Sequence, residues 1–191
     1  MKTGLYFGSF NPIHIGHLAI ANFMIEFSDL EQLWFVVSPQ NPLKEKLSLL
    51  KDYHRLEMVR LAVEDDDRFR ASDIEFKLPT PSYTIDTLAY LEELNPGKEF
   101  QLVMGADGLR TFHKWKHAKL IVKNYHRLIY PRPNTGMDAA SDLSNATVVN
   151  APLMEISSSF IRQAIREGKD VRHLVPAKAY QYMREMHFYE K

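Results

Sequence analysis

The sequence predicts an α/β protein built on a parallel sheet with helices on both faces and a helical cap at its C-terminus. Over the first 154 residues, short continuous apolar runs alternate with longer segments of helical period. Beyond that point the pattern is purely helical. Strands that are buried on both faces read as continuous apolar runs, which is typical of parallel sheets covered by their crossover helices.

The expected strands are short apolar runs at residues 5–7, 33–37, 100–104, 127–130 and 146–149. The helices expected between them lie at residues 16–27, 53–64, 84–94 and 117–122, where apolar residues recur with helical spacing. Two further helices are expected at residues 158–167 and 177–186, separated by a segment with glycine and proline stop signals. Residues 131–145 are expected to form a flexible loop.

Length and composition narrow the class of protein. A chain of 191 residues suits a single domain, with a core over residues 1–154 and a helical segment over residues 155–191. The 24 lysines and arginines balance 24 aspartates and glutamates, so no excess positive charge favours a nucleic-acid partner. The absence of cysteine excludes disulfides and thiolate metal sites. The apolar stretch before Gly8 is too short for a signal or membrane segment, so a cytoplasmic protein without a membrane partner is expected.

A first phosphate site is predicted in GSFNPIHIGHL, residues 8–18, between the first strand and the helix that follows. Such a junction offers unpaired backbone N–H groups and a positive helix end to an anion. Gly8 and Ser9 let a phosphate approach the backbone closely. His14 and His17 are three residues apart, so both imidazoles can donate to one phosphate.

Other interpretations of His14 and His17 stay open at this point. They could be a turn residue and a helix-start residue without a function, or they could be ligands of a metal. A metal is disfavoured because no further histidine or acidic ligand lies at metalloprotease spacing. The segment is not a Walker A loop, since no Gly-Lys-Ser/Thr follows, and it lacks the three-glycine dinucleotide spacing.

A second phosphate site is predicted in EISSSFIR, residues 155–162, where three serines stand at a helix start. Ser158 and Arg162 are four residues apart, which places them on one face of that helix. Serines there can cap the helix and bind phosphate, and a guanidinium one turn later can pair with phosphate oxygens. The alternative is an ordinary helix cap beside a surface arginine.

Together, the two segments resemble the paired H-x-G-H and I-S-S-T-x-x-R signatures of the nucleotidyltransferase superfamily, with Ser159 in place of the usual threonine. Three further segments narrow the resemblance: PSYTIDTL at residues 81–88, GADGLRTFHKW at residues 105–115 and HLVPAKAYQYM at residues 173–183. With them, nearly the whole chain is similar to the bacterial nicotinate-nucleotide adenylyltransferases. The resemblance implies a Rossmann-like fold and transfer of AMP from ATP to nicotinate mononucleotide, giving nicotinate adenine dinucleotide and pyrophosphate in NAD biosynthesis.

The resemblance also implies roles for particular residues. The catalytic donors it implies are His14, His17 and Arg162. The residues it implies for the rest of the ATP site are Gly8, Ser9, Phe10, Gly105, Asp107, Ile156, Ser157 and Ser158. The residues it implies for the nicotinate mononucleotide site are Asn41, Lys44, Tyr83, Thr84 and Trp115. Tryptophan is often a core residue and aspartate often caps a helix, so Trp115 and Asp107 each have a structural alternative. The chain departs from the family pattern at Asn11, Leu43 and Asn134, where aspartate, histidine and glycine are usual.

The chemistry implied by this resemblance needs charge stabilisation and no general base, because the attacking phosphate oxygen is already anionic. Mg²⁺ is expected as a cofactor bound through the ATP phosphates and water, without protein ligands. ATP and nicotinate mononucleotide are the expected partners, and a homo-oligomer stays open. The alternatives are an enzyme that adenylylates nicotinamide mononucleotide or pantetheine phosphate, and a sensor that binds nucleotide without turning it over. A class I aminoacyl-tRNA synthetase shares the histidine signature, but it is longer and has a lysine-rich loop.

Overall fold

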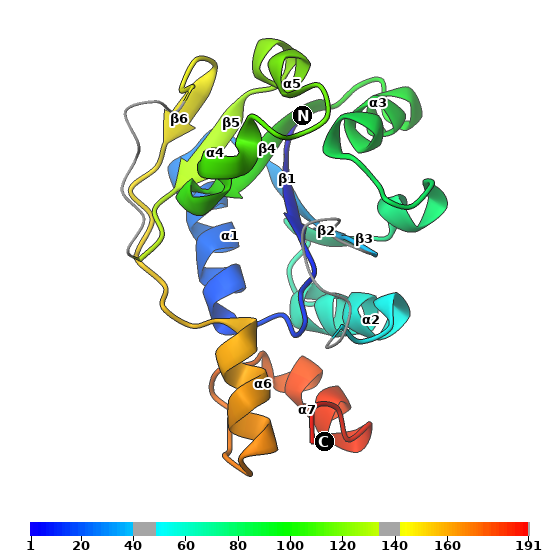
Figure 1. The fold of residues 1–191 in the computed structure, drawn as a ribbon, viewed down its shortest axis with the longest axis vertical. Coiled ribbons are helices and arrows are strands. Elements are labelled where there is room, and N and C mark those ends of the chain that lie inside the picture. Colours follow the sequence, from blue (N-terminus) through cyan, green and yellow to red (C-terminus); the bar gives the residue numbers. More distant parts are fainter. Residues whose placement is uncertain (40–48, 134–141, 191) are drawn as a thin grey trace.

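The computed structural model describes residues 1–39, 49–133 and 142–190, which form a parallel sheet of six strands in the order β3-β2-β1-β4-β5-β6 (Figure 1). The strands are β1 (Lys2–Gly8), β2 (Gln32–Val37), β3 (Phe69–Ser72), β4 (Glu99–Gly105), β5 (Arg127–Tyr130) and β6 (Ala146–Val148). The helices are α1 (Ile15–Phe27), α2 (Asp52–Val63), α3 (Thr84–Leu94), α4 (Ala106–Phe112), α5 (Ala118–Asn124), α6 (Ser158–Arg166) and α7 (Ala177–Glu185), and η2 (Ile74–Lys77) is a 3-10 helix. The predicted Rossmann-like α/β fold is confirmed.

The central strand β1 is the point where the strand order changes direction. Leu5 is in register with Trp34 of β2 on one side and with Leu102 of β4 on the other. The chain builds β2 and β3 outward from one side of β1, and then β4, β5 and β6 outward from the other side. In such sheets, ligands bind beyond the carboxyl ends of the strands at this switch point. Gly8 and Gly105, the last residues of β1 and β4, therefore mark the expected position of the site.

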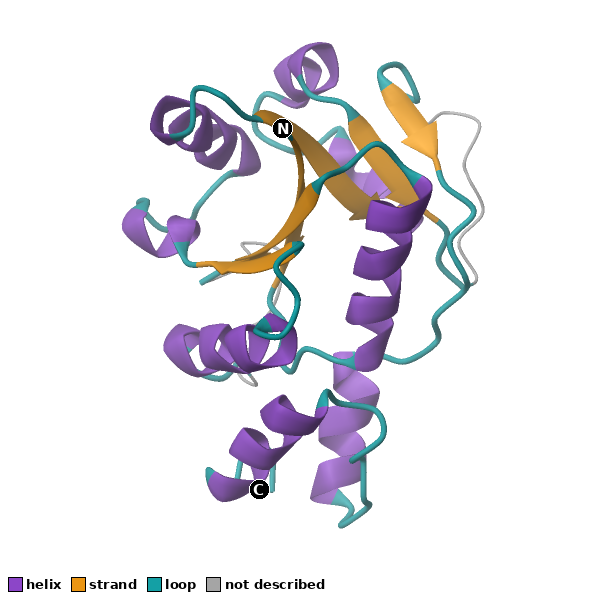
Figure 2. Ribbon diagram, turned by 180° about the vertical axis from the view of Figure 1, so that it is seen from behind, coloured by secondary structure: helices purple, strands orange, loops and turns teal. Residues whose placement is uncertain are grey.

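Helices pack on both faces of the sheet because successive strand residues point to opposite sides. Tyr6 and Phe35 pack with α1 and α2, whereas Leu5 and Trp34 pack with α3, α4 and α5. Figure 2 shows α1 lying across the near face of the sheet. The continuous apolar strands of the sequence thus serve two separate cores.

The C-terminal helices lie at one end of the molecule, next to α1 and α2 (Figure 1). Ile161 of α6 and Met183 of α7 join the same core as α1 and α2. The N–H of Ile15, which begins α1, donates to the carbonyl of Leu174 at 3.0 Å. The predicted C-terminal cap is therefore held directly against the helix that follows β1.

Several boundaries and elements differ from the sequence-based expectations. Strand β3, the 3-10 helix η2 and helix α4 were not expected. The expected strands and helices lie within two residues of their predicted ends, except that β1 begins three residues earlier than predicted. In the predicted flexible loop at residues 131–145, the described residues 142–145 are anchored, because Arg127 Nη2 donates to the carbonyls of Asp142 and Ser144. Residues 134–141 lie outside the described part of the chain. None of the helices in the described ranges is long and apolar enough to cross a membrane.

Candidate active site

The phosphate loop, defined here as residues 8–14, joins the end of β1 to the start of α1. A Cβ on Gly8 would lie 2.8 to 3.0 Å from the ring of Phe10, so a larger residue at position 8 would displace that ring. Phe10 itself has a positive φ of 43° and packs its ring against Tyr6 and Phe35. Because its side chain is buried in the core, Phe10 can offer only its backbone to a ligand.

The two histidines of the H-x-G-H segment lie face to face at the N-terminus of α1. Their ring centroids are 3.7 Å apart with an interplanar angle of 28°, and His14 is the residue before the first helical turn. The backbone N–H of His14 donates to Nδ1 of His17 at 3.2 Å. Since Nδ1 is the acceptor, the neutral tautomer of His17 carries its proton on Nε2. His17 can therefore donate a hydrogen bond from Nε2 without being charged.

His14 differs from His17 in its burial. Only 4% of its surface is exposed, and burial together with the nearby charge of Arg132 lowers its pKa to about 4. Its Nδ1 has no hydrogen-bond partner among the described residues. His14 is thus a neutral imidazole at pH 7, and its side chain faces the backbone N–H of His17 in a capping-box arrangement at the start of α1.

The structure brings the second predicted phosphate segment onto the first. Ser158 Oγ donates to the carbonyl of Pro12 at 2.9 Å, and Arg162 Nη1 donates to the carbonyl of Asn11 at 2.8 Å. Ser157 caps α6 by accepting from the N–H of Phe160 at 3.2 Å. The expected shared face of Ser158 and Arg162 is therefore the face that meets the phosphate loop. Nε of Arg162 is buried and has no hydrogen-bond partner in the described chain.

Gly105 and Asp107 lie where β4 passes into α4. Gly105 is the residue before α4, and a Cβ there would lie 2.4 Å from Asp107 Oδ1 and 3.0 Å from Arg132 Nε. Asp107 stands in the first turn of α4 and faces Arg132, with 3.5 Å between Oδ1 and Nε. Glycine at position 105 is what lets this carboxylate and this guanidinium meet over the end of β4.

A cavity of about 10 Å³, with room for about one water molecule, lies beside the histidines, and its lining includes a residue that the sequence left without a role. Arg132, just beyond β5, lines it together with Tyr6, His14, Gly16, His17, Ile20, Tyr130, Pro131, Met154 and Ile156. The hydroxyls of Tyr6 and Tyr130 are 2.9 Å apart, and the guanidinium of Arg132 lies 5.3 Å from the centre of the Tyr130 ring. The predicted ATP-site residue Ile156 thus shares a pocket with both histidines.

Two of the predicted acceptor residues, Tyr83 and Thr84, lie at the start of α3. Tyr83 precedes α3 and is partly exposed, and Thr84 is the first residue of the helix. Lys116 lies over the ring of Tyr83 at 4.9 Å and pairs with Asp86 at 2.8 Å, which brings the end of the 105–115 segment to this helix start. Trp115 is half-buried, with its ring 5.1 Å from that of Phe112. Asn41 and Lys44, like Leu43 and Asn134, lie outside the described residues.

Glu75 in η2 is a buried acid that sequence reasoning missed. It is 3% exposed, Thr87 Oγ1 donates to it at 2.9 Å, and the hydroxyls of Ser38 and Ser82 also face it. Burial raises its pKa, which favours the protonated form of the carboxyl. Thr87 and Ser82 belong to the PSYTIDTL segment, so Glu75 links that segment to the end of β2. The only signal in the sequence was an acid inside the short apolar stretch at residues 74–76.

Comparisons with known proteins agree with this geometry. Residues 5–164 match the family model described as Cytidylyltransferase-like. A relative from Flavobacterium johnsoniae is 51% identical over 193 residues and covers 100% of both chains, and one from Bacteroides thetaiotaomicron is 47% identical, covering 97% of this chain and 92% of the relative. Both are named "Probable nicotinate-nucleotide adenylyltransferase". The structure of Plasmodium falciparum nicotinic acid mononucleotide adenylyltransferase complexed with NaAD has a TM-score of 0.83 at 20% identity, covering 99% of this chain and 97% of that one, which shows the shared fold.

The fold and the paired phosphate segments define a nucleotidyltransferase of the cytidylyltransferase-like class. The relatives of nearly the same length show which family within that class the chain belongs to. This chain belongs to the nicotinate-nucleotide adenylyltransferase family, as the sequence predicted.

Proposed function

We propose that the chain transfers the AMP group of ATP to nicotinate mononucleotide, giving nicotinate adenine dinucleotide and pyrophosphate. One observation carries the proposal for the site: Ser158 and Arg162 of α6 are bonded to Pro12 and Asn11 of the phosphate loop. That contact gathers two helix N-termini, two histidines and a guanidinium around one position. Such a set of donors suits a polyphosphate.

The reaction needs no protein base. An anionic oxygen of the acceptor phosphate forms a bond to the α-phosphorus of ATP, the bond from that phosphorus to the bridging oxygen breaks, and its electron pair leaves with pyrophosphate. Two polyanions must meet in line, so the barrier is lowered by positioning and by donors that stabilise negative charge. The uncharged His14 and the Nε2 proton of His17 suit donation to phosphate, and His14 gains basicity as an anion approaches.

Arg162 and Mg²⁺ complete the proposed charge stabilisation. Arg162 keeps its charge at any relevant pH, and its Nε is unused within the described chain. Within the described ranges, no three His, Asp or Glu residues are grouped so as to hold a metal. We propose that Mg²⁺ binds mainly through the ATP phosphates and water, as this ion commonly does in nucleotide sites, where it neutralises phosphate charge.

The acceptor is proposed from the segments around Tyr83, Thr84 and Trp115. The first turn of α3 offers backbone N–H groups of the kind that bind a carboxylate, and Trp115 offers an aromatic ring within the same stretch of chain as Lys116. Nicotinate mononucleotide carries a carboxylate that nicotinamide mononucleotide lacks. These features support nicotinate mononucleotide as the preferred acceptor.

The test is pyrophosphate release with ATP and Mg²⁺ in the presence of nicotinate mononucleotide, nicotinamide mononucleotide or pantetheine phosphate. We expect the highest kcat/KM with nicotinate mononucleotide and little release with ATP alone. A higher kcat/KM with the amide or with pantetheine phosphate would reassign the acceptor. ATP binding without any pyrophosphate release would instead identify a nucleotide sensor.

A further inference from the structure

Arg55 of α2 is a fully buried arginine, 0% exposed, and each of its hydrogen bonds to the described residues runs to a backbone carbonyl. Its Nη1 donates to Ser9 O at 2.6 Å and to Ser38 O at 2.8 Å. Its Nη2 donates to Pro39 O at 3.2 Å, and its Nε donates to Leu50 O at 3.0 Å. One guanidinium therefore joins the phosphate loop, the segment after β2 and the residue that leads into α2.

The burial of this charge needs an explanation, because an arginine in the interior loses its hydration and stays charged. No carboxylate lies within ion-pair distance of Arg55 among the described residues, and Asp52 acts on it only at longer range. Burial accordingly lowers the pKa of Arg55. The free-energy cost of burying this charge is offset by its hydrogen bonds to the carbonyl oxygens. Those bonds form only if the guanidinium and the carbonyls are correctly placed, so each holds the other in position.

The bonded carbonyls belong to segments that are also tied to each other. The N–H of Ser38 donates to Gly8 O at 2.9 Å, and the N–H of Leu50 donates to Asn11 Oδ1 at 3.3 Å. Leu50 is thus held through both its N–H and its C=O. Asn11 Oδ1 also accepts from the hydroxyl of Tyr189 at 2.7 Å, which ties the C-terminal end of the chain to the same point.

The bond to Ser9 has a direct consequence for the phosphate loop. The peptide unit between Ser9 and Phe10 is trans and planar, so its C=O and N–H point in opposite directions. Because Arg55 draws the carbonyl of Ser9 toward α2, the N–H of Phe10 points away from α2. The positive φ of Phe10, 43°, is part of the same local conformation.

We propose that Arg55 is a positioning residue for adenylyl transfer: its carbonyl bonds set the orientation of the phosphate loop and hold it to the end of β2. Arg55 itself does not touch substrate. The proposal rests on the proposed function for its kinetic readout. Its binding readout, affinity for a non-reacting ATP analogue, does not.

The test compares Arg55→Met with Arg127→Met. Arg127 is also 0% exposed and also donates to backbone carbonyls, those of Asp142 and Ser144, but it lies at the amino end of β5. Both variants lose a buried guanidinium, so both are expected to lower the Tm. Only Arg55→Met should weaken binding of α,β-methylene ATP, measured by calorimetry, and raise the KM for ATP, by about tenfold or more, with a lower kcat per folded molecule.

The outcomes separate positioning from simple support of the fold. A merely structural Arg55 would reduce the folded fraction and leave the KM for ATP and the affinity for the analogue unchanged. Folded Arg55→Met with both constants within about twofold of the original protein would overturn the proposal. If Arg55→Met does not fold, Arg55→Lys decides, because a lysine keeps the charge but cannot reproduce the planar fork that reaches four carbonyls. Unchanged constants in Arg55→Lys would overturn the proposal equally.

Discussion

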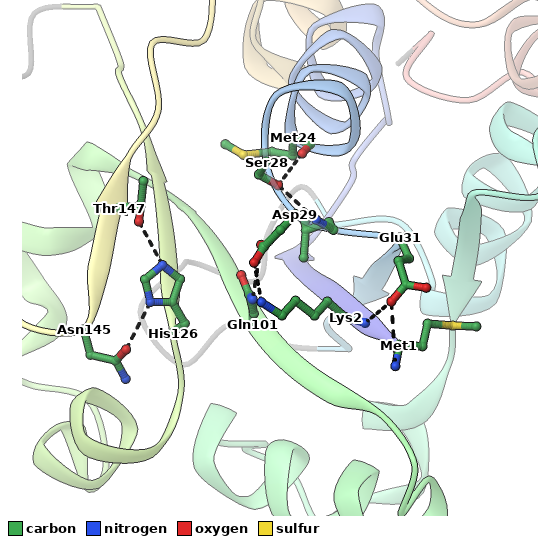
Figure 3. Close-up of polar contacts among 11 residues, drawn as sticks. Met1, Lys2, Met24, Ser28, Asp29, Glu31, Gln101, His126, Asn145 and Thr147 are labelled. Atoms are coloured by element: carbon green, nitrogen blue, oxygen red, sulfur yellow. Dashed lines mark hydrogen bonds and ion pairs between the residues drawn. The ribbon is translucent and has the colours of Figure 1, made fainter.

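The two ends of the parallel sheet use charge in different ways. At the amino end, several charges are exposed and matched by opposite charges: Lys2 Nζ pairs with Asp29, and the N-terminal amine lies 3.7 Å from Glu31 (Figure 3). The buried Arg127, which donates to backbone carbonyls, is an exception at this end. Gln101 adds an amide that faces Asp29 at 3.5 Å. These are ordinary surface ion pairs, whose contribution to stability is small and is screened by salt.

At the carboxyl end, three arginines that are buried or half-buried lie around the predicted site. Arg55 and Arg162 both donate to carbonyls of the phosphate loop, and Arg132 has Asp107 as its carboxylate neighbour. Even the buried acid at this end, Glu75, has a raised pKa that disfavours its negative form. Exposed charges at the amino end thus pair with one another, whereas Arg55 and Arg162 at the carboxyl end place positive charge beside the predicted phosphate site.

The strongest test of this comparison is a histidine substitution at each end. His17→Ala removes a donor that would stabilise charge in the transition state, so we expect kcat to fall by about a hundredfold or more. His126→Ala is the control, because His126 lies at the amino end and bonds Asn145 and Thr147 (Figure 3). Steady-state pyrophosphate release measures both variants. Near-normal turnover of His17→Ala would remove the catalytic role.

A second test compares a glycine at each end of β4: Gly105 is its last residue, and Gly97 lies two residues before its start. Gly105→Ala places a Cβ against Asp107 and Arg132, whereas Gly97→Ala at the amino end meets nothing within 4 Å. The new Cβ must displace the ends of these two flexible side chains, so the Tm should change little while the KM for ATP rises, about tenfold for each ~1.4 kcal/mol of binding lost. Gly97→Ala should leave both KM values unchanged. Equal behaviour of the two variants would show that the contact between Asp107 and Arg132 does not shape the ATP site.

A third test asks whether the acceptor side depends on ring contact in addition to charge. Stacking of a base on an aromatic side chain is worth about 1–3 kcal/mol, so Trp115→Ala should raise the KM for nicotinate mononucleotide about tenfold. Trp115→Phe keeps a ring and serves as the control, with a smaller rise. The KM for ATP should change little in either variant. An unchanged KM for the mononucleotide in Trp115→Ala would assign Trp115 to the core that it shares with Phe112.

The smallest effect is expected at the amino end, from Asp29→Asn. The Lys2 ammonium holds the pKa of Asp29 below its ordinary value, so this carboxylate stabilises the fold above the unfolded-state pKa and loses that effect as pH falls through the folded-state pKa. The Tm of Asp29→Asn should therefore be slightly lower at neutral pH and equal to that of the original protein in acid. High salt should also remove the difference, and kcat should not change. A large loss of activity would contradict the separation of the two ends.

Much of the fold could be predicted from the sequence, and the failures have identifiable causes. Strands such as β5, with four buried residues, read clearly as continuous apolar runs. Strand β3 was missed because FRAS is short, half polar and at the edge of the sheet. Helix α4 was missed because it is short, contains Gly108 and begins directly after β4. In both cases tertiary packing outweighs local preference.

The sequence by itself determined the family, the alternation of strands and helices, and the two phosphate segments, because these depend on residue type and local spacing. Only the tertiary structure decided that Ser158 and Arg162 contact Pro12 and Asn11, about 150 residues away in the chain. It alone also assigned partners to Arg55 and Glu75. The physical reason is that backbone carbonyls are present in every residue and leave no mark in a sequence, so the bonds of a buried arginine appear only once the chain has folded.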